Sequence, residues 1–148
     1  MYKSQNTLSK IIDFTGIGLH SGERVKISLI PTAIDTGINF KINNTLILAS
    51  WQNAVVSQLC TRLKFRENAI STIEHLMAAI SGLGITNLII QINSNEVPIL
   101  DGSSKEFVDE IRNVGITEQN KKQKILKILK KVEHKDQEKL IYILPSKK

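Results

Sequence analysis

Two adjacent residues, Glu74 and His75, have side chains suited to acid–base or metal chemistry, and they lie in a stretch with helical spacing. The apolar residues of that stretch recur at i, i+3, i+4 and i+7 and are Ile73, Leu76, Met77 and Ile80. With a helical turn of about 100° per residue, His75 points almost opposite this apolar stripe. A histidine there is placed to bind a metal or to act as a base. The structural alternative is that Glu74 caps the helix and His75 hydrogen-bonds a loop.

Capping signals predict where this helix and a second one begin and end. Ser71 is followed three residues later by Glu74, the spacing of a capping box, and Gly82 is a natural stop. Ser103 opens the same pattern with Glu106, and we expect that helix to end near Gly115. The sequence therefore predicts two helices, one from Ser71 to Gly82 and one from Ser103 to near Gly115.

Period-two alternation predicts strands around these helices. We expect them at 25–29, at 37–42 and 45–48 around an Asn43-Asn44 turn, at 88–92, and at 125–129 and 140–144 as a closing hairpin. The polar stretch 117–124 is predicted to be a linker. Because strands and helices occur in blocks, an α+β fold is favoured over a doubly wound sheet. The expected organisation is a first α+β domain over 1–120, followed over 121–148 by a linker and the first hairpin of an incomplete second domain.

The net charge of +6 is concentrated at one end of the chain. Residues 121–148 contain ten lysines and three acidic residues, whereas residues 1–120 have a net charge of −1. The basic end has no interleaved aromatic pattern and no arginine, so we expect no nucleic-acid partner. A single cysteine excludes an internal disulfide, and no apolar stretch is long enough for a leader or a membrane span. These features favour a cytoplasmic globular protein.

Three longer motifs resemble one known family. They are GIGLHSGERV (16–25), STIEHLMAAISGLGITN (71–87) and EVPILDGSSKEFV (96–108). In order and spacing they are similar to the zinc-dependent UDP-3-O-acyl-N-acetylglucosamine deacetylase of lipid A biosynthesis, a bacterial hydrolase. The resemblance is close over residues 10–116 and looser over 125–145. It implies a two-layer domain of sheet and helices resembling the second domain of ribosomal protein S5, and the start of a second similar domain.

The resemblance also implies roles for individual residues. The family removes an N-acetyl group from a UDP-sugar lipid precursor with a water activated by one Zn²⁺. His75 matches its zinc ligand and Glu74 its general base, which is the chemistry that amide hydrolysis needs at neutral pH. His20 falls in a loop that the family places near the cleft, and Lys139 matches loosely a lysine that faces the UDP diphosphate.

The same comparison predicts an incomplete zinc site. A catalytic zinc needs about three protein ligands, and the family takes the other two, a His and an Asp, from its second domain. We therefore expect this chain to be the N-terminal half and to be inactive alone; a separate chain is one source of the missing half. Two substitutes are less favoured: His134 with Asp136, whose spacing is i, i+2, and a three-histidine site of His20, His75 and His134.

Two further hypotheses about the chain do not require catalysis. The chain could be a binding module that uses its basic C-terminal end, or a remnant of the fold with no present activity. Cys60 is interpreted as a small buried apolar residue rather than a nucleophile. Residues 56–58 (VSQ) depart from the Asp-Thr pair usual in the family, so the geometry beside Cys60 is left open.

Overall fold

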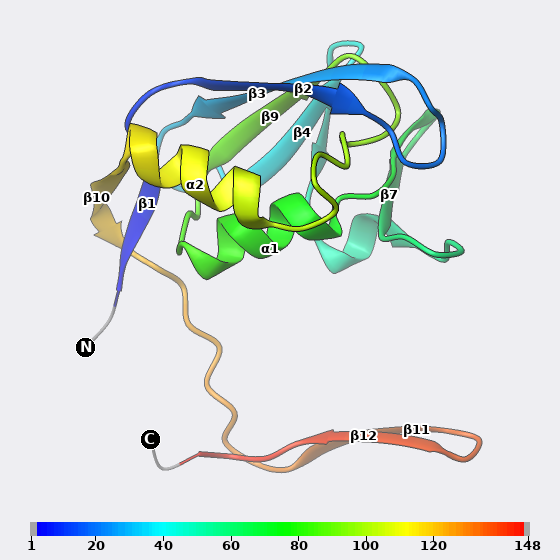
Figure 1. Cartoon of the computed structure of the whole chain (residues 1–148). Helices are drawn as coiled ribbons and strands as arrows, with labels where there is room; N and C mark the ends of the chain where they lie inside the picture. Colours follow the sequence, from blue (N-terminus) through cyan, green and yellow to red (C-terminus); the bar gives the residue numbers. More distant parts are fainter. Residues whose placement is uncertain (1–2, 147–148) are drawn as a thin grey trace.

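Strands with alternating apolar residues build a central five-stranded sheet in the computed structural model, which describes residues 3–146 (Figure 1). The order is β2 (Ile12–Ile17), β3 (Arg24–Pro31), β9 (Leu88–Ile92), β4 (Ile38–Ile42) and β5 (Thr45–Leu48). β4 and β9 run parallel, and the other neighbours run antiparallel. Ile90 pairs with Leu29 on one side and Phe40 on the other, so three fully buried side chains form a row across the sheet.

Two helices cover one face of this sheet (Figure 1). α1 (Glu74–Gly82) buries Leu76 within the core, and α2 (Lys105–Val114) buries Phe107. The Phe107 ring meets Phe14 of β2 edge-on, with the ring centroids 5.0 Å apart. Sheet and helices thus share one hydrophobic core as two layers. No helix in the described part of the chain is long and apolar enough to cross a membrane.

The two ends of the main body are joined by β1 (Ser4–Leu8) and β10 (Ile116–Lys122), which pair antiparallel. A buried amide network fixes this pair to the central sheet. Asn87 Nδ2 donates to Gln5 Oε1 at 2.8 Å and to Gln119 Oε1 at 2.7 Å. Since buried amides must be paired to be tolerated, these contacts hold the register of β1 and β10.

The remaining strands form two small sheets. The short helix η1 (Trp51–Asn53) leads into β6 (Ala54–Val55), β7 (Arg62–Phe65) and β8 (Asn68–Ile70), which pair in that order. β11 (Val132–Asp136) and β12 (Lys139–Ile143) form a hairpin that lies apart from the two-layer body (Figure 1).

The α+β class predicted from the sequence is confirmed by this architecture. The hairpin around Asn43-Asn44 is also confirmed, with both residues at positive φ between β4 and β5. The α2 helix ends at Val114 and is followed by Gly115, whose φ of 89° favours glycine, near the predicted end.

The predicted capping boxes are wrong. α1 begins at Glu74 after Ile73, with no side-chain cap, because the Ser71 backbone forms a parallel bridge with Glu96. α2 begins after Ser104, and Ser103 Oγ accepts the Lys105 N–H at 3.0 Å. The spacing of residues along the chain could not show that the Ser71 backbone pairs with Glu96 in the folded protein.

The predicted linker and the first strand of the closing hairpin are also misplaced. Residues 117–122 belong to β10, and the irregular connection is 123–131. The hairpin pairs 132–136 with 139–143 around a two-residue turn in which Gln137 has a φ of 52°. A turn this short pairs adjacent segments, which excludes 125–129 as the partner of 140–144.

Candidate functional site

The segment that leads into α1 has an unusual backbone. Ser71 pairs with Glu96 as an isolated bridge, and Thr72 next to it has a φ of 57° while its side chain is buried. A β-branched residue in the left-handed region is strained, so its surroundings must hold it there. Glu74 and His75 follow directly, as the first two residues of α1. Their positions therefore depend on the contacts that fix Thr72.

Those contacts converge on the carboxylate of Glu96, which is only 4% exposed. Glu96 Oε1 accepts the Thr72 hydroxyl at 2.8 Å and the His20 N–H at 3.0 Å. Glu96 Oε2 accepts the Ser21 N–H at 2.8 Å. One buried side chain thus ties the loop around His20 to the start of α1.

The pKa of Glu96 reflects this environment. Burial alone would raise the pKa, because it disfavours the charged carboxylate. The hydrogen bonds from the His20 N–H, from Ser21 and from the Thr72 hydroxyl outweigh burial and lower the pKa to about 2. Glu96 is therefore a fixed negative charge at neutral pH and cannot exchange protons with a substrate there.

A glycine allows the loop to approach this carboxylate. A Cβ atom on Gly18 would lie 2.6 Å from Glu96 Oε2 and 2.3 Å from Ser21 Oγ, both too close for a side chain. The Gly22 N–H closes the turn on the Gly18 carbonyl at 2.9 Å. The loop 18–22 is thus shaped around Glu96, and the exposed His20 side chain projects from it.

Glu74 has a partner outside its own helix. Its Oε2 accepts the Thr61 N–H at 2.9 Å, so the carboxylate points towards the chain just before β7 and does not cap α1. His75 is half-buried, and within residues 3–146 its imidazole makes no hydrogen bond or ion pair. Neither contact proposed by the structural alternative, a cap from Glu74 or a loop bond from His75, is present in this part of the chain.

An open cleft of about 400 Å³ lies beside this segment. It is lined by residues from four parts of the chain: His20, Ser21, Glu23, Ser57, Gln58, Cys60, Ser71, Ser94, Asn95 and Glu96. Cys60 Sγ lies 3.2 Å from Ser57 Oγ and is half-buried. Glu74 and His75 do not line the cleft, but Glu74 reaches Thr61, the neighbour of Cys60.

The other predicted site residues lie elsewhere. Lys139 and His134 are exposed on the β11–β12 hairpin, which the structure does not bring to α1 (Figure 1). Asp136 pairs with Lys139 in the same hairpin. Among residues 3–146, no three His, Cys, Asp or Glu side chains are grouped so as to hold a metal ion, so neither substitute zinc site forms there.

Glu96 and Thr72 were assigned no role from the sequence, although one signal was available. Glu96 is the only Asp, Glu, Lys or Arg between Glu74 and Asp101. A single charge in so apolar a stretch indicates a buried group that needs several partners. The left-handed φ of Thr72 had no such signal, because threonine does not favour it.

Comparisons with known proteins match almost the whole chain. A sequence model described as LpxC, UDP-3-O-acyl N-acetylglycosamine deacetylase, matches residues 5–148. The UDP-3-O-acyl-N-acetylglucosamine deacetylase of Legionella pneumophila is 41% identical over 147 residues, which are 97% of this chain and 48% of that protein. The protein of the same name from Brucella melitensis is 40% identical over 132 residues, 86% of this chain and 46% of that protein. The chain spans about half the length of the curated relatives it matches. It therefore belongs to the UDP-3-O-acyl N-acetylglycosamine deacetylase family.

Proposed function

We propose that this chain supplies the N-terminal part of a zinc-dependent deacetylase that hydrolyses the N-acetyl group of UDP-3-O-acyl-N-acetylglucosamine. Glu74 acts as the general base and His75 as one zinc ligand. The observation that carries the proposal is the placement of this pair at the start of α1, with Glu74 hydrogen-bonded to Thr61 and the His75 imidazole left without a partner among the described residues. Family membership supplies the reaction.

The donor set of this chain fits only part of a zinc site. A catalytic zinc takes about three protein ligands and keeps one position open, whereas the described residues contain no group of three suitable side chains. His75 fits one of those positions. We assign the remaining ligands to the length that the relatives have beyond this match. When bound, zinc acts as a Lewis acid towards the water and the amide carbonyl.

The residues of this chain then have separate tasks. Glu74 takes a proton from the attacking water, and the Thr61 N–H orients its carboxylate for that step. Glu96 does not take part in proton transfer, because its carboxylate is already saturated by donors. It holds Thr72, and with it the first turn of α1, in one conformation.

Two residues are proposed to contact the substrate. His20 lines the 400 Å³ cleft. Lys139 is proposed to face the UDP diphosphate once the hairpin is packed in a second domain, of which residues 121–148 supply the linker and the first hairpin. We assign the first domain, residues 1–120, the topology of the second domain of ribosomal protein S5.

The reaction is placed in the bacterial cytoplasm, whose reducing conditions suit a single unpaired cysteine.

The test combines this chain with the C-terminal half of the Legionella relative, by fusion or in trans. Glu74→Gln should keep bound zinc and lower acetate release by ~10²–10⁴, the usual contribution of a positioned base. His75→Ala should lose zinc, because one of about three protein ligands is removed. Metal content and acetate release are measured on the same preparations, and the 148-residue chain alone should release no acetate.

Glu110→Gln is the matched control, since that residue is exposed on α2 and does not line the cleft. It should leave both zinc content and turnover unchanged. A His75→Ala protein that retains full zinc would refute the assignment of the ligand. Turnover by Glu74→Gln equal to that of the unchanged protein would refute the assignment of the base.

A further inference from the structure

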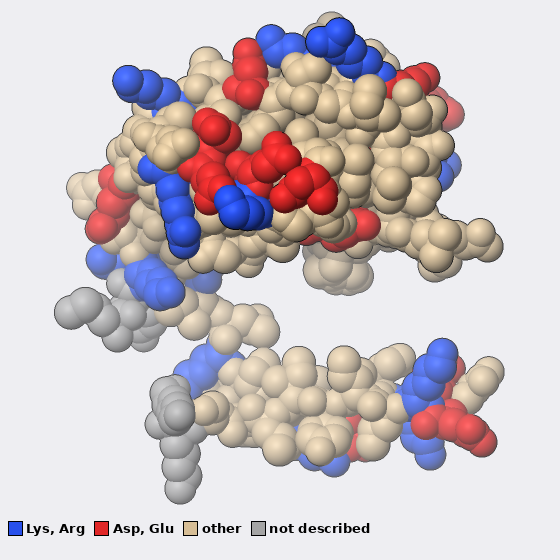
Figure 2. All heavy atoms as spheres, viewed as in Figure 1, with Lys and Arg blue, Asp and Glu red and all other residues tan. Residues whose placement is uncertain are grey.

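Among residues 3–146, Glu96 is the only acidic residue that is buried. Figure 2 shows other acidic side chains gathered on the surface over α2. A carboxylate on the surface is solvated by water, whereas a buried one is tolerated only when protein donors replace that water. The donors to Glu96 come from two separate segments, the loop 18–22 and Thr72.

The backbone around Glu96 joins the same two segments. Residues 95–99 pair with Ser71 through backbone hydrogen bonds of 2.9 and 3.1 Å. The same stretch donates an N–H to the Ile17 carbonyl at 2.9 Å and forms an isolated bridge with Gly18. The stretch 95–99 is therefore bonded both to the loop that follows β2 and to the residues that lead into α1.

The Glu96 carboxylate binds the two segments through different kinds of donor. From the loop it accepts the main-chain N–H groups of His20 at 3.0 Å and Ser21 at 2.8 Å, which can only donate. From the other segment it accepts the Thr72 hydroxyl at 2.8 Å, which can also act as an acceptor. Since Glu96 Oε1 takes both the His20 and the Thr72 contact, a shift of either segment disturbs the bond to the other.

Both segments contribute to the candidate site. His20 of the loop and Ser71 line the cleft of about 400 Å³, and Glu74 and His75 follow Ser71 at the start of α1. A displacement of one segment relative to the other would change the position of the base and the zinc ligand relative to the substrate loop. A misplacement on the order of 1 Å can lower a catalytic rate by about 10²-fold.

We propose that Glu96 is a positioning residue of the deacetylase that couples the loop 18–22 to the first turn of α1. The loop that contacts the substrate and the pair Glu74 and His75 are then held as one unit. The roles of these residues in the reaction rest on the proposed function. The coupling itself is a property of this chain and is measurable without catalysis, because loosening the contact on one side should loosen the other side.

Thr72→Val removes the hydroxyl that Glu96 accepts and keeps a β-branched side chain of similar size. In the 148-residue chain, the amide protons of His20 and Ser21 should then exchange with solvent about threefold faster or more, as measured by NMR. Thr72→Ser retains a hydroxyl and should keep the slow exchange. Unchanged exchange of both amides in Thr72→Val would overturn the proposal.

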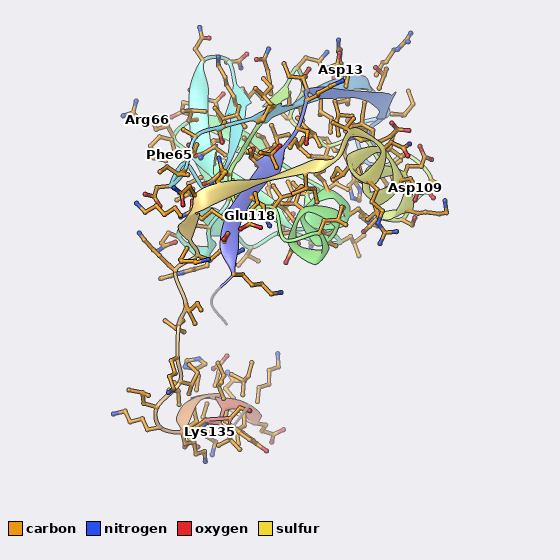
Figure 3. The ribbon with its side chains drawn as sticks, turned by 90° about the vertical axis from the view of Figure 1, so that its left-hand side faces the viewer. Asp13, Phe65, Arg66, Asp109, Glu118 and Lys135 are labelled. Carbon is orange, nitrogen blue, oxygen red and sulfur yellow. The ribbon has the colours of Figure 1, made fainter. Side chains whose placement is uncertain are left out.

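Thr7→Val is the matched control, because it removes another buried threonine hydroxyl, which donates to the Asn87 carbonyl at 2.7 Å. Thr7 lies in β1, and Figure 1 shows the β1–β10 pair and the loop between β2 and β3 on opposite sides of the body. Figure 3 looks onto the side of β1 and β10, where Glu118 of β10 is labelled. Thr7→Val should leave exchange at His20 and Ser21 unchanged. An increase equal to that in Thr72→Val would indicate a general loss of stability and overturn the proposal.

Kinetics of the protein reconstituted with the C-terminal half of the Legionella relative should separate the two sides. Glu96→Gln places an amide NH₂ where one oxygen was, and the Thr72 hydroxyl can accept from it, whereas the main-chain N–H groups of the loop cannot. The KM should therefore rise about fivefold, with a smaller change in kcat. Thr72→Val should lower kcat about tenfold, with a smaller change in KM.

The double variant tests whether the two contacts belong to one network. Its loss of kcat/KM should be smaller than the product of the two single losses, because both changes break the same set of bonds. A loss equal to the full product would overturn the proposal. Circular dichroism at the assay temperature checks that each variant is folded.

The two kinds of measurement distinguish a failure of this inference from a failure of the proposed function. Uncoupled exchange in the 148-residue chain, with zinc binding and acetate release intact in the reconstituted protein, would refute this inference alone. Coupled exchange, with neither zinc binding nor acetate release in the reconstituted protein, would refute the proposed function.

Discussion

Replacing Glu96 with glutamine removes the buried charge that joins the His20 loop to the start of α1. Glutamine is close in shape to the protonated carboxyl, so the free energy that ionised Glu96 contributes to the folded state, relative to the unfolded chain, gives the order of magnitude of the cost. The folded pKa is about 2 against a usual value of 4.5. At about 1.4 kcal/mol for each pH unit between these values, Glu96→Gln should destabilise the fold by about 3 kcal/mol at neutral pH.

The pH dependence follows from the direction of the shift. Because the folded pKa lies below the unfolded value, the stabilisation is complete above pH 4.5 and is lost as the pH falls towards 2. The free energy of unfolding, measured by urea denaturation across this range, should decline in the unchanged protein and decline less in Glu96→Gln. The two curves should converge near the acid end.

The difference between the two curves isolates Glu96 from other carboxyls. Hydrogen bonds from neighbouring groups also lower the pKa values of Asp13, Asp35 and Asp101, but these residues are present in both proteins. Glu110→Gln, an exposed change of the same type, should alter stability by no more than about 0.5 kcal/mol. A loss from Glu96→Gln that is independent of pH, or smaller than about 1 kcal/mol at neutral pH, would refute the reasoning.

Two further changes probe the packing around the site. Gly18→Ala should destabilise the fold by about 1–3 kcal/mol, because the new Cβ clashes with the Glu96 carboxylate. At Gly82 a new Cβ meets nothing within 4 Å, so Gly82→Ala should be neutral or slightly stabilising. Equal changes in the melting temperatures of the two variants would contradict the close approach at Gly18. Asn87→Ala should lower the free energy of unfolding by about 2–4 kcal/mol, measured by urea denaturation, because Gln5 and Gln119 lose a buried partner. A decrease no larger than that caused by Asn113→Ala, at an exposed position, would contradict this expectation.

The sequence predicted those parts of the fold that depend on the alternation of apolar residues and on turn-forming residues. The alternation at Val25, Ile27 and Leu29 produced β3, and Asn43-Asn44 produced the β4–β5 turn. These signals act within a few residues of one another and need no tertiary information.

Errors arose where a distant partner competed with a local signal. Ser71 had the spacing of a cap, but Glu96, 25 positions later, pairs with its backbone. The polar residues of β10 resembled a linker because its exposed pattern is that of a strand at a sheet edge, paired only with β1. For the candidate site, the sequence indicated Glu74 and His75, but not the carboxylate that fixes the backbone before them.

The pairing of β1 with β10 has a consequence for the order in which the protein can fold during synthesis. Ser9 and Thr117, whose hydroxyls meet beside this pair at 2.9 Å, are 108 positions apart. At a synthesis rate of ~5–20 residues per second, β1 leaves the ribosome on the order of 5–20 s before its partner. During that interval β1 has an open edge, and the amide network of Gln5 and Asn87 lacks Gln119. β10, the last strand of the body, therefore closes the fold by covering the edge of β1. A nascent chain that stalls before residue 116 leaves that edge exposed, and non-native strand pairing can begin there.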